Sequence, residues 1–289
     1  MQTKSLVRVC SLVVLLVLIS RSALAQTHNK PKIVALAPHI VELLFEMGAG
    51  EQIIGTSDFA DFPEAAKSIP IVGNYLGVNV EQILALQPDV VIAWRSENGS
   101  AQLKQLADLG VRVIYSNPTS LNAIPAEIRT FGKLSERSEA AEAVAQHFEQ
   151  SLATMKAKYA KLNAMKQQEA DAGVRVFYEL WPQPLTTVAK GSWNQALLSV
   201  CQVNNVFYDA IAPYPQVNIE QVIQRNVDVI IQPASQKGDG QPKFNWQAWP
   251  IIPAVKHHRI LKPDADKLHR MTSRVLPELD KLCEAIYQQ

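Results

Sequence analysis

The chain has 289 residues, of which 47% are hydrophobic and 19% are charged, and its formal net charge is +1. A charge so close to neutral gives no electrostatic reason to expect nucleic acid or an anionic membrane surface as a partner. The length suits one large or two medium domains.

The first 25 residues have the pattern of a secretory signal peptide. Lys4 and Arg8 give it a basic start, an uncharged and largely aliphatic run covers residues 9–19, and the segment ends in Ala-Leu-Ala, which fits the small-x-small cleavage pattern. The aliphatic run is about half the ~20 residues that a membrane-spanning helix needs. We therefore expect residues 1–25 to be removed and the mature protein to be exported.

Short aliphatic runs alternate with amphipathic stretches in residues 26–134, which we predict to form one α/β lobe. Strands that alternate with helices pair in parallel, and the helices cover both faces of the sheet. The predicted strands are residues 33–36, 53–55, 89–94 and 111–115. The predicted helices are one from Pro38 to Gly48, residues 80–86 and residues 101–109.

Residues 135–168 contain no Pro or Gly and read as one long helix. Their apolar positions recur three or four residues apart, at Val144, Phe148, Leu152, Met155, Tyr159 and Leu162. At a rise of 1.5 Å per residue such a helix would be about 50 Å long. Because one lobe does not need that length, we assign residues 135–170 to a rigid helix between two lobes.

The alternation resumes in residues 171–289, which we predict to form a second α/β lobe. Its predicted strands are residues 174–178, 227–231 and 259–261, and its predicted helices are residues 194–200 and 275–287.

Two cysteines, Cys201 and Cys283, remain once the signal peptide is removed. In an exported chain an even pair favours a disulfide, here closing a loop of about 80 residues. Two buried free thiols are the alternative. No metal site is predicted, because no His or Cys lies at short ligand spacing from either cysteine.

Residues 75–93 and 214–232 form an internal repeat, in which eight of nineteen positions are identical without a gap. The repeated unit is predicted to be a loop, a helix and a strand. Asn79 and Asn218 are suitable N-caps, and a Gln three residues after each completes the capping-box pattern. Glu81 and Glu220 then lie in the first helical turn, where the helix dipole favours a carboxylate.

The repeat also predicts where a ligand would bind. Tyr75 and Tyr214 lie in the loops that precede the two helices, and parallel α/β sheets bind ligands at loops along one sheet edge. We therefore expect a cleft that receives one aromatic side chain from each lobe. The alternative is a duplicated architecture in which the tyrosines and glutamates have no role.

On these features the sequence resembles the periplasmic solute-binding proteins whose two lobes are joined by one long helix, the class III periplasmic binding proteins. These proteins serve ABC importers of cobalamin, haem and ferric siderophores, and the chain is most similar to the cobalamin-binding members. The matching stretches are residues 55–63, 73–95 and 213–222, together with the cysteine pair.

The resemblance implies an α/β fold of two Rossmann-like lobes with parallel sheets. It also implies a periplasmic, monomeric, non-enzymatic component of an ABC importer, which carries cobalamin (vitamin B12) as transported ligand and no cofactor or metal. By resemblance, the ligand-binding residues are Phe59, Tyr75, Trp94, Tyr214, Asp266 and Arg270. By resemblance, the residues that dock on the inner-membrane permease are Glu81 and Glu220.

Three alternatives stay open at this stage. A haem-binding protein of the same fold would offer an iron ligand such as Tyr75, Tyr214 or His39, although a His at a helix start is usually solvated. A ferric-siderophore protein would offer several arginines, whereas only Arg95 and Arg270 are near the predicted cleft. An exported enzyme lacks support, because the chain has no Gly-x-Ser-x-Gly, phosphate-binding or His-Glu-x-x-His motif.

Overall fold

The computed structural model describes residues 30–74, 76–95, 100–169, 173–235 and 243–288. The predicted signal peptide and Tyr75 lie outside these residues. Pro31–Gln289 form one compact unit. Within the described ranges, no helix combines the length and the apolar character that crossing a membrane requires.

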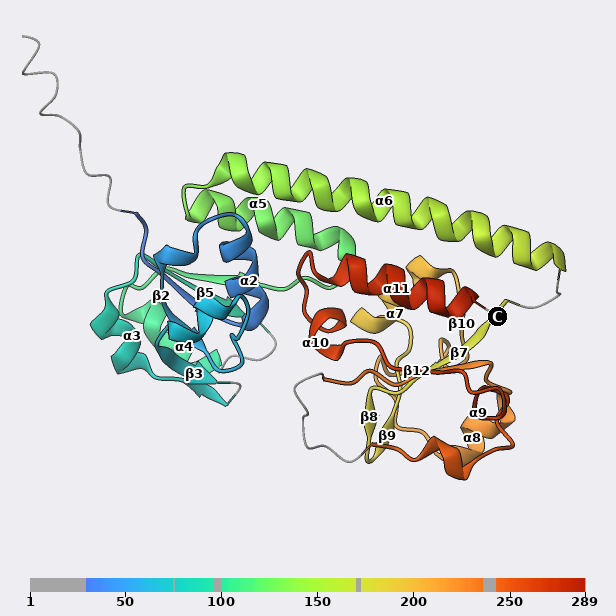
Figure 1. Ribbon diagram of the computed structural model, residues 1–289. Helices are drawn as coiled ribbons and strands as arrows, with labels where there is room; N and C mark the ends of the chain where they lie inside the picture. Colours follow the sequence, from blue (N-terminus) through green and yellow to red (C-terminus); the bar gives the residue numbers. More distant parts are fainter. Residues whose placement is uncertain (1–29, 75, 96–99, 170–172, 236–242, 289) are drawn as a thin grey trace, which may run out of the picture. The chain divides into compact units, whose positions relative to one another are not determined.

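A six-stranded sheet of order β4-β3-β2-β1-β5-β6 forms the first lobe (Figure 1). Its neighbouring strands are parallel except β3 and β4. The strands are β1 (Ile33–Leu36), β2 (Ile53–Ser57), β3 (Ile71–Asn74), β4 (Gly77–Val78), β5 (Val90–Trp94) and β6 (Val113–Ser116). The predicted parallel sheet is confirmed, whereas the short antiparallel pair β3–β4 was not predicted.

Helices cover both faces of this sheet. The helices are α2 (Pro38–Glu46), α3 (Val80–Leu86), α4 (Ser100–Asp108) and α5 (Ile124–Leu134). Ile33 and Ala35 of β1 belong to the same core as buried residues of α2 and α5, whereas Val34 and Leu36 belong to a second core with residues of α3 and α4. This alternation follows from the two-residue period of a strand.

Helix α6 (Ser138–Glu169) is the predicted long helix, with 32 residues. Its buried residues recur at intervals of three or four, at Ala141, Ala145, Phe148, Leu152, Met155 and Tyr159. The helix begins three residues later than predicted. Ser135 is the C-cap of α5, and Glu136 has a φ of 55°, so the chain turns there before α6 begins.

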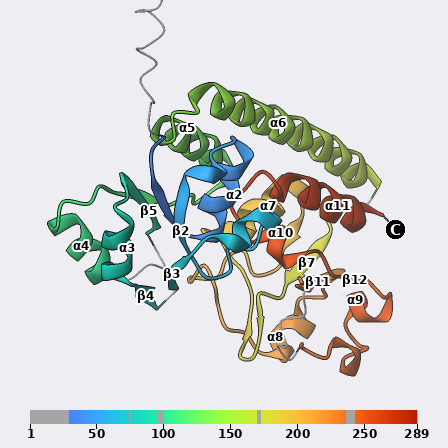
Figure 2. The same cartoon turned by 60° about the vertical axis from the view of Figure 1, so that its left-hand side comes forward.

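Helix α5 was not predicted, and it packs against the N-terminal part of α6 (Figures 1 and 2). Arg129 of α5 donates hydrogen bonds to Glu142 and Glu149 of α6. The two backbones approach closely at Gly132, where an added Cβ would lie 2.2 Å from the Cβ of Ala141. The long helix is therefore braced by a second helix where it leaves the first lobe.

A four-stranded parallel sheet of order β10-β7-β11-β12 forms the second lobe. Its strands are β7 (Arg175–Tyr178), β10 (Asn204–Asn205), β11 (Val229–Ile231) and β12 (Ile260–Leu261), and a hairpin of β8 (Trp181–Pro182) and β9 (Leu185–Thr186) follows β7. Its helices are α7 (Trp193–Cys201), α8 (Ile219–Gln224), α9 (Pro253–Lys256), α10 (Ala265–Leu268) and α11 (Val275–Tyr287).

The predicted disulfide is present between Cys201, the last residue of α7, and Cys283 in α11. Both cysteines are fully buried, and their Cα atoms are 5.1 Å apart. The bond joins two helices of the second lobe across 82 residues of sequence. The hydroxyl of Tyr287 donates to the Cys201 carbonyl and adds a second tie between the same helices.

Candidate ligand-binding site

The carboxyl ends of β1, β2, β5 and β6 lie along one edge of the first sheet, because these strands are parallel. The residues at or just after these ends include His39, Phe59, Trp94 and Ser116. Ligands of parallel α/β sheets collect at this kind of edge. Phe59 is 69% exposed and has a φ of 61°, so the turn after β2 presents its ring to solvent.

Trp94 ends β5 and is partly buried. Its ring meets the ring of His39 edge to face, with centroids 5.2 Å apart and an interplanar angle of 77°. His39 was expected to be solvated, and that expectation is wrong: it is 2% exposed and its Nε2 lies 2.7 Å from Ser116 Oγ. Burial lowers the pKa of His39 to about 3, so the imidazole is neutral at pH 7.

Tyr214 lies in the loop before α8 and is 47% exposed. The loop is held beside the segment that follows the β8–β9 hairpin, because Thr187 N–H donates to the Pro215 carbonyl and Ala189 N–H to the Pro213 carbonyl. The Tyr214 hydroxyl accepts a long hydrogen bond of 3.4 Å from Trp193 N–H. Its ring is thus available at the surface of the second lobe.

The β8–β9 hairpin adds an exposed aromatic residue, Trp181, which was not among the predicted ligand-binding residues. Trp181 lies in β8, three residues after the carboxyl end of β7, and is 50% exposed. Its position just beyond a strand end was the available signal, but the two-residue strands β8 and β9 are too short to recognise from a hydrophobic pattern.

The repeated loop-helix-strand unit is present in both lobes as α3–β5 and α8–β11. Asn79 and Asn218 cap their helices as predicted, each accepting from the N–H three residues on. The reciprocal half of the capping box forms at Asn218, whose N–H donates to Gln221 Oε1. At Asn79 the prediction is wrong, because its N–H donates instead to the Val72 carbonyl. Glu81 and Glu220 are exposed in the first helical turns.

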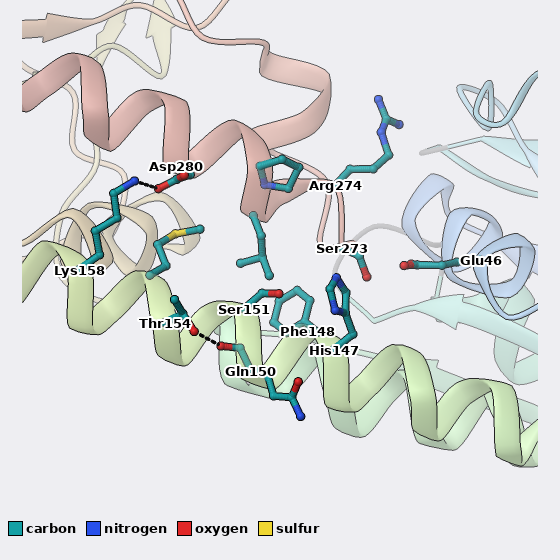
Figure 3. Close-up of a pocket in the computed structure, with 13 residues that line it drawn as sticks. Glu46, His147, Phe148, Gln150, Ser151, Thr154, Lys158, Ser273, Arg274 and Asp280 are labelled. Atoms are coloured by element: carbon teal, nitrogen blue, oxygen red, sulfur yellow. Dashed lines mark hydrogen bonds and ion pairs between the residues drawn. The ribbon is translucent and has the colours of Figure 1, made fainter.

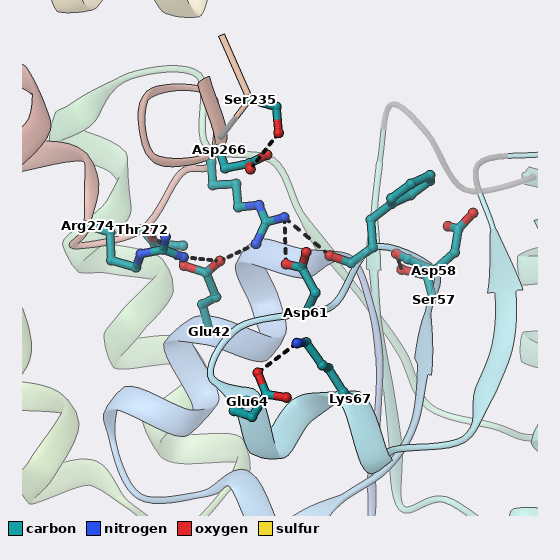
Figure 4. Close-up of polar contacts among 12 residues, drawn as sticks. Glu42, Ser57, Asp58, Asp61, Glu64, Lys67, Ser235, Asp266, Thr272 and Arg274 are labelled. Atoms are coloured by element: carbon teal, nitrogen blue, oxygen red, sulfur yellow. Dashed lines mark hydrogen bonds and ion pairs between the residues drawn. The ribbon is translucent and has the colours of Figure 1, made fainter. Parts of the chain in front are cut away.

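Asp266 and Arg270 have different hydrogen-bond partners, and Figure 4 shows Asp266 beside Ser235. Asp266 in α10 accepts a hydrogen bond of 3.1 Å from Ser235 Oγ. Arg270, just after α10, reaches the first lobe: its guanidinium lies 2.7 Å from Glu42 Oε1 and 2.9 Å from Asp61 Oδ1. It also donates to the Phe59 carbonyl at 3.3 Å. Arg270 therefore lies where the two lobes meet, next to the exposed Phe59.

Glu42 of α2 is the centre of this cross-lobe cluster. It is 4% exposed and accepts hydrogen bonds from Arg270, Thr272 and Arg274 of the second lobe. Arg274 also stacks over the Phe62 ring, with its guanidinium carbon 3.8 Å from the centroid. Sequence reasoning missed Glu42, because nothing in an amphipathic helix identifies a buried carboxylate whose partners are more than 220 residues away.

Two cavities lie near the same junction. One of 360 Å³ borders the cluster and is lined by Glu42, Phe45, Glu46, Phe62, Pro63, Thr272 and Arg274. A larger one of 890 Å³ lies between α6 and α11 (Figure 3). Its lining includes none of the predicted ligand-binding residues, and part of its polar lining is paired internally, as in the Lys158–Asp280 ion pair. The strand-end residues therefore define the candidate site better than cavity size does.

Comparisons with known proteins identify relatives over most of the chain. A family profile described as "Periplasmic binding protein" matches residues 33–266. A vitamin B12-binding protein of Vibrio campbellii is 34% identical over 255 residues, covering 88% of this chain and 88% of the relative. A second, of Vibrio vulnificus, is 35% identical over 255 residues, covering 88% and 89%.

Solved structures give the same picture. The crystal structure of the periplasmic vitamin B12 binding protein BtuF of Vibrio cholerae matches with a TM-score of 0.76 and 31% identity, covering 89% of this chain and 96% of that chain. The periplasmic heme-binding protein BhuT in complex with two hemes matches with a TM-score of 0.77, but at 18% identity it shares the fold alone.

Proposed function

Because the chain belongs to the periplasmic binding protein family, we propose that it is the periplasmic substrate-binding component of an ABC importer. It binds cobalamin in a cleft between its two lobes and delivers it to the permease. The observation that carries this proposal is the junction at Arg270, where a cation of the second lobe touches the backbone of an exposed aromatic residue of the first.

Exposed side chains of the two lobes suit a corrinoid. Such a ligand is large and flat and carries amides on its rim. Exposed rings such as Phe59, Tyr214 and Trp181 can cover its faces, each contributing about 0.5–1.5 kcal/mol beyond area burial. The Arg270 guanidinium can donate to rim amide or phosphate oxygens. The relatives named as vitamin B12-binding proteins support the same ligand class.

The proposal includes location and partner. The protein is exported through its N-terminal segment, works as a monomer in the periplasm and needs no cofactor. Glu81 and Glu220 lie in the first turns of α3 and α8, one helix in each lobe, and both are exposed. They are the proposed contacts for basic residues of the permease.

Haem is the second candidate ligand, because a haem-binding protein shares the fold and Tyr214 offers an exposed phenol. His39 is not suited to hold the iron, since it is 2% exposed and its Nε2 is engaged with Ser116. The chain therefore offers fewer iron ligands than its sequence suggests.

Calorimetric titration of the chain from residue 26 with cyanocobalamin, with haem run in parallel, tests the proposal. Saturable one-to-one binding of cyanocobalamin alone is the expected result. Haem binding without cyanocobalamin binding would move the ligand to an iron porphyrin. Binding of neither cyanocobalamin nor haem would contradict both ligand assignments.

A further inference from the structure

Three residues of the first lobe form a hydrogen-bonded chain that ends at the ring of Trp94. Glu127 of α5 accepts hydrogen bonds from the Ser116 hydroxyl and from Asn117 N–H. Ser116 Oγ lies 2.7 Å from His39 Nε2, and the His39 ring makes the edge-to-face contact with Trp94. The chain thus joins α5, the end of β6, the start of α2 and the end of β5.

With the Glu127 carboxylate ionised, the number of available protons sets the hydrogen-bond directions in this network. A hydroxyl has one proton, and Ser116 donates it to Glu127. The bond between Ser116 and His39 therefore needs a proton from the imidazole, which must carry it on Nε2. Burial keeps His39 neutral by lowering its pKa to about 3, so one ring proton is present at pH 7 and its position is set by Ser116.

Sheet register places the parts so that His39 touches both neighbours. Trp94 and Ser116 are direct partners in the parallel pair β5–β6, so their side chains leave the same face of the sheet. His39, in the first turn of α2, covers that face at the strand ends. Ser116 is 0% exposed and His39 is 2% exposed, so water does not compete for their hydrogen bond.

We propose that His39 is a positioning residue for ligand recognition: Glu127 and Ser116 hold its imidazole in one orientation, and the imidazole holds the indole of Trp94 at the ligand-facing edge. The role at the ligand rests on the proposed function, in which Trp94 contacts the corrinoid. A ring held in place before binding loses less conformational freedom when the ligand binds. The hydrogen-bonded residues Glu127, Ser116 and His39 therefore raise the affinity without touching the ligand. It also favours flat ligands that match this ring orientation.

The test measures the environment of the Trp94 ring by NMR. The protein contains five tryptophans, so replacing them with 5-fluorotryptophan gives five fluorine NMR resonances, and Trp94→Phe identifies the one from Trp94. In Ser116→Ala and His39→Phe the Trp94 resonance is expected to shift or broaden while the other four stay in place. Affinity for cyanocobalamin is expected to fall about 3- to 10-fold, the equivalent of one aromatic contact.

Glu127→Gln is the milder variant, should burial make the other two unfold: its side-chain oxygen still accepts a hydrogen bond, so a smaller shift of the same resonance is expected. His257→Phe, at an exposed position, is the control and is expected to leave the Trp94 resonance and the affinity unchanged. A Trp94 resonance at the wild-type position in folded Ser116→Ala and Glu127→Gln would overturn the inference. Failure of the wild-type protein to bind cyanocobalamin would instead refute the proposed function, while the resonance would still report whether His39 positions Trp94.

Discussion

Arg270 Nη1 donates to Glu42 Oε1 at 2.7 Å, although 228 residues separate the two in sequence. Glu42 lies in α2 of the first lobe, and Arg270 follows α10 in the second lobe. Because Arg270 is also a proposed ligand contact, the same guanidinium belongs to the lobe junction and to the candidate site. In the proposed function, ligand binding and the packing of the lobes therefore share a residue.

Replacing Glu42 by Gln is expected to lower the free energy of unfolding by about 3–5 kcal/mol, the usual result of breaking a buried ion pair. The variant removes the buried counter-charge that the guanidinium groups of Arg270 and Arg274 share. Urea denaturation measures the change. Glu64→Gln, in the exposed pair with Lys67, is the matched control and should have a far smaller effect. Equal effects of the two substitutions would contradict the central role of Glu42.

Asp61→Asn is expected to strengthen cyanocobalamin binding a few-fold. Asp61 Oδ1 lies 2.9 Å from Arg270, so a ligand that recruits this guanidinium competes with the aspartate. Removing the charge lowers that cost while Glu42 still holds Arg270 in place. Calorimetric titration of the variant checks the effect, with Asp58→Asn in the same turn as the control. Weaker binding in Asp61→Asn would mean that Asp61 orients Arg270 and does not compete for it.

Reduction of the disulfide is expected to destabilise the protein by about 2–4 kcal/mol, because the closed loop spans 82 residues and restricts the unfolded chain. Thermal unfolding with and without reductant measures the difference. The double variant Cys201→Ala, Cys283→Ala provides the control, since reductant should not change its unfolding temperature. Two free thiols in the mass of the untreated protein would contradict the bond.

Acidification from pH 7 toward pH 4 is expected to lower the free energy of unfolding. Burial lowers the pKa of His269 to about 4 and that of His39 to about 3, both from 6.5. Below pH 6.5 the unfolded chain therefore binds protons that the folded chain refuses, so stability is lost as pH falls through this window. Within this window, protonation of each histidine lowers the free energy of unfolding by up to about 1.4 kcal/mol per pH unit.

Urea denaturation at a series of pH values measures this dependence. His269→Gln can keep a partner for the Tyr178 hydroxyl, which lies 2.9 Å from His269 Nε2, and should make the dependence shallower. His257→Gln, at an exposed site, is the control. A His269→Gln protein with the wild-type pH profile would show that His269 does not account for the loss.

Reversing the charges of Glu81 and Glu220 together is expected to abolish ligand uptake by cells and to leave ligand affinity unchanged. Both carboxylates are exposed in the first turns of α3 and α8. Neither is among the residues that bond Arg270 at the lobe junction. Growth on cyanocobalamin as sole corrinoid measures uptake, and calorimetry measures affinity. Reversal at the exposed Glu139 of α6 is the control. A fall in affinity in the double variant would contradict a docking role.

The sequence by itself determined the features that depend on neighbours along the chain. Helix α6 was predictable because its apolar residues recur at helical spacing without Pro or Gly. The strands β1, β5 and β7 were predictable because each is a short aliphatic or aromatic run. The repeat fixed two helix caps and two exposed glutamates, since a cap involves atoms only three residues apart.

Only the tertiary structure decided which polar side chains meet. His39 proved to be buried because the end of β6 supplies Ser116 as its partner, 77 residues away. Asp266 and Arg270 are only four residues apart in sequence, but Asp266 bonds Ser235 and Arg270 bonds Glu42. A buried charge is stable only with a partner, and that partner is chosen by how the two lobes pack, which no local pattern records.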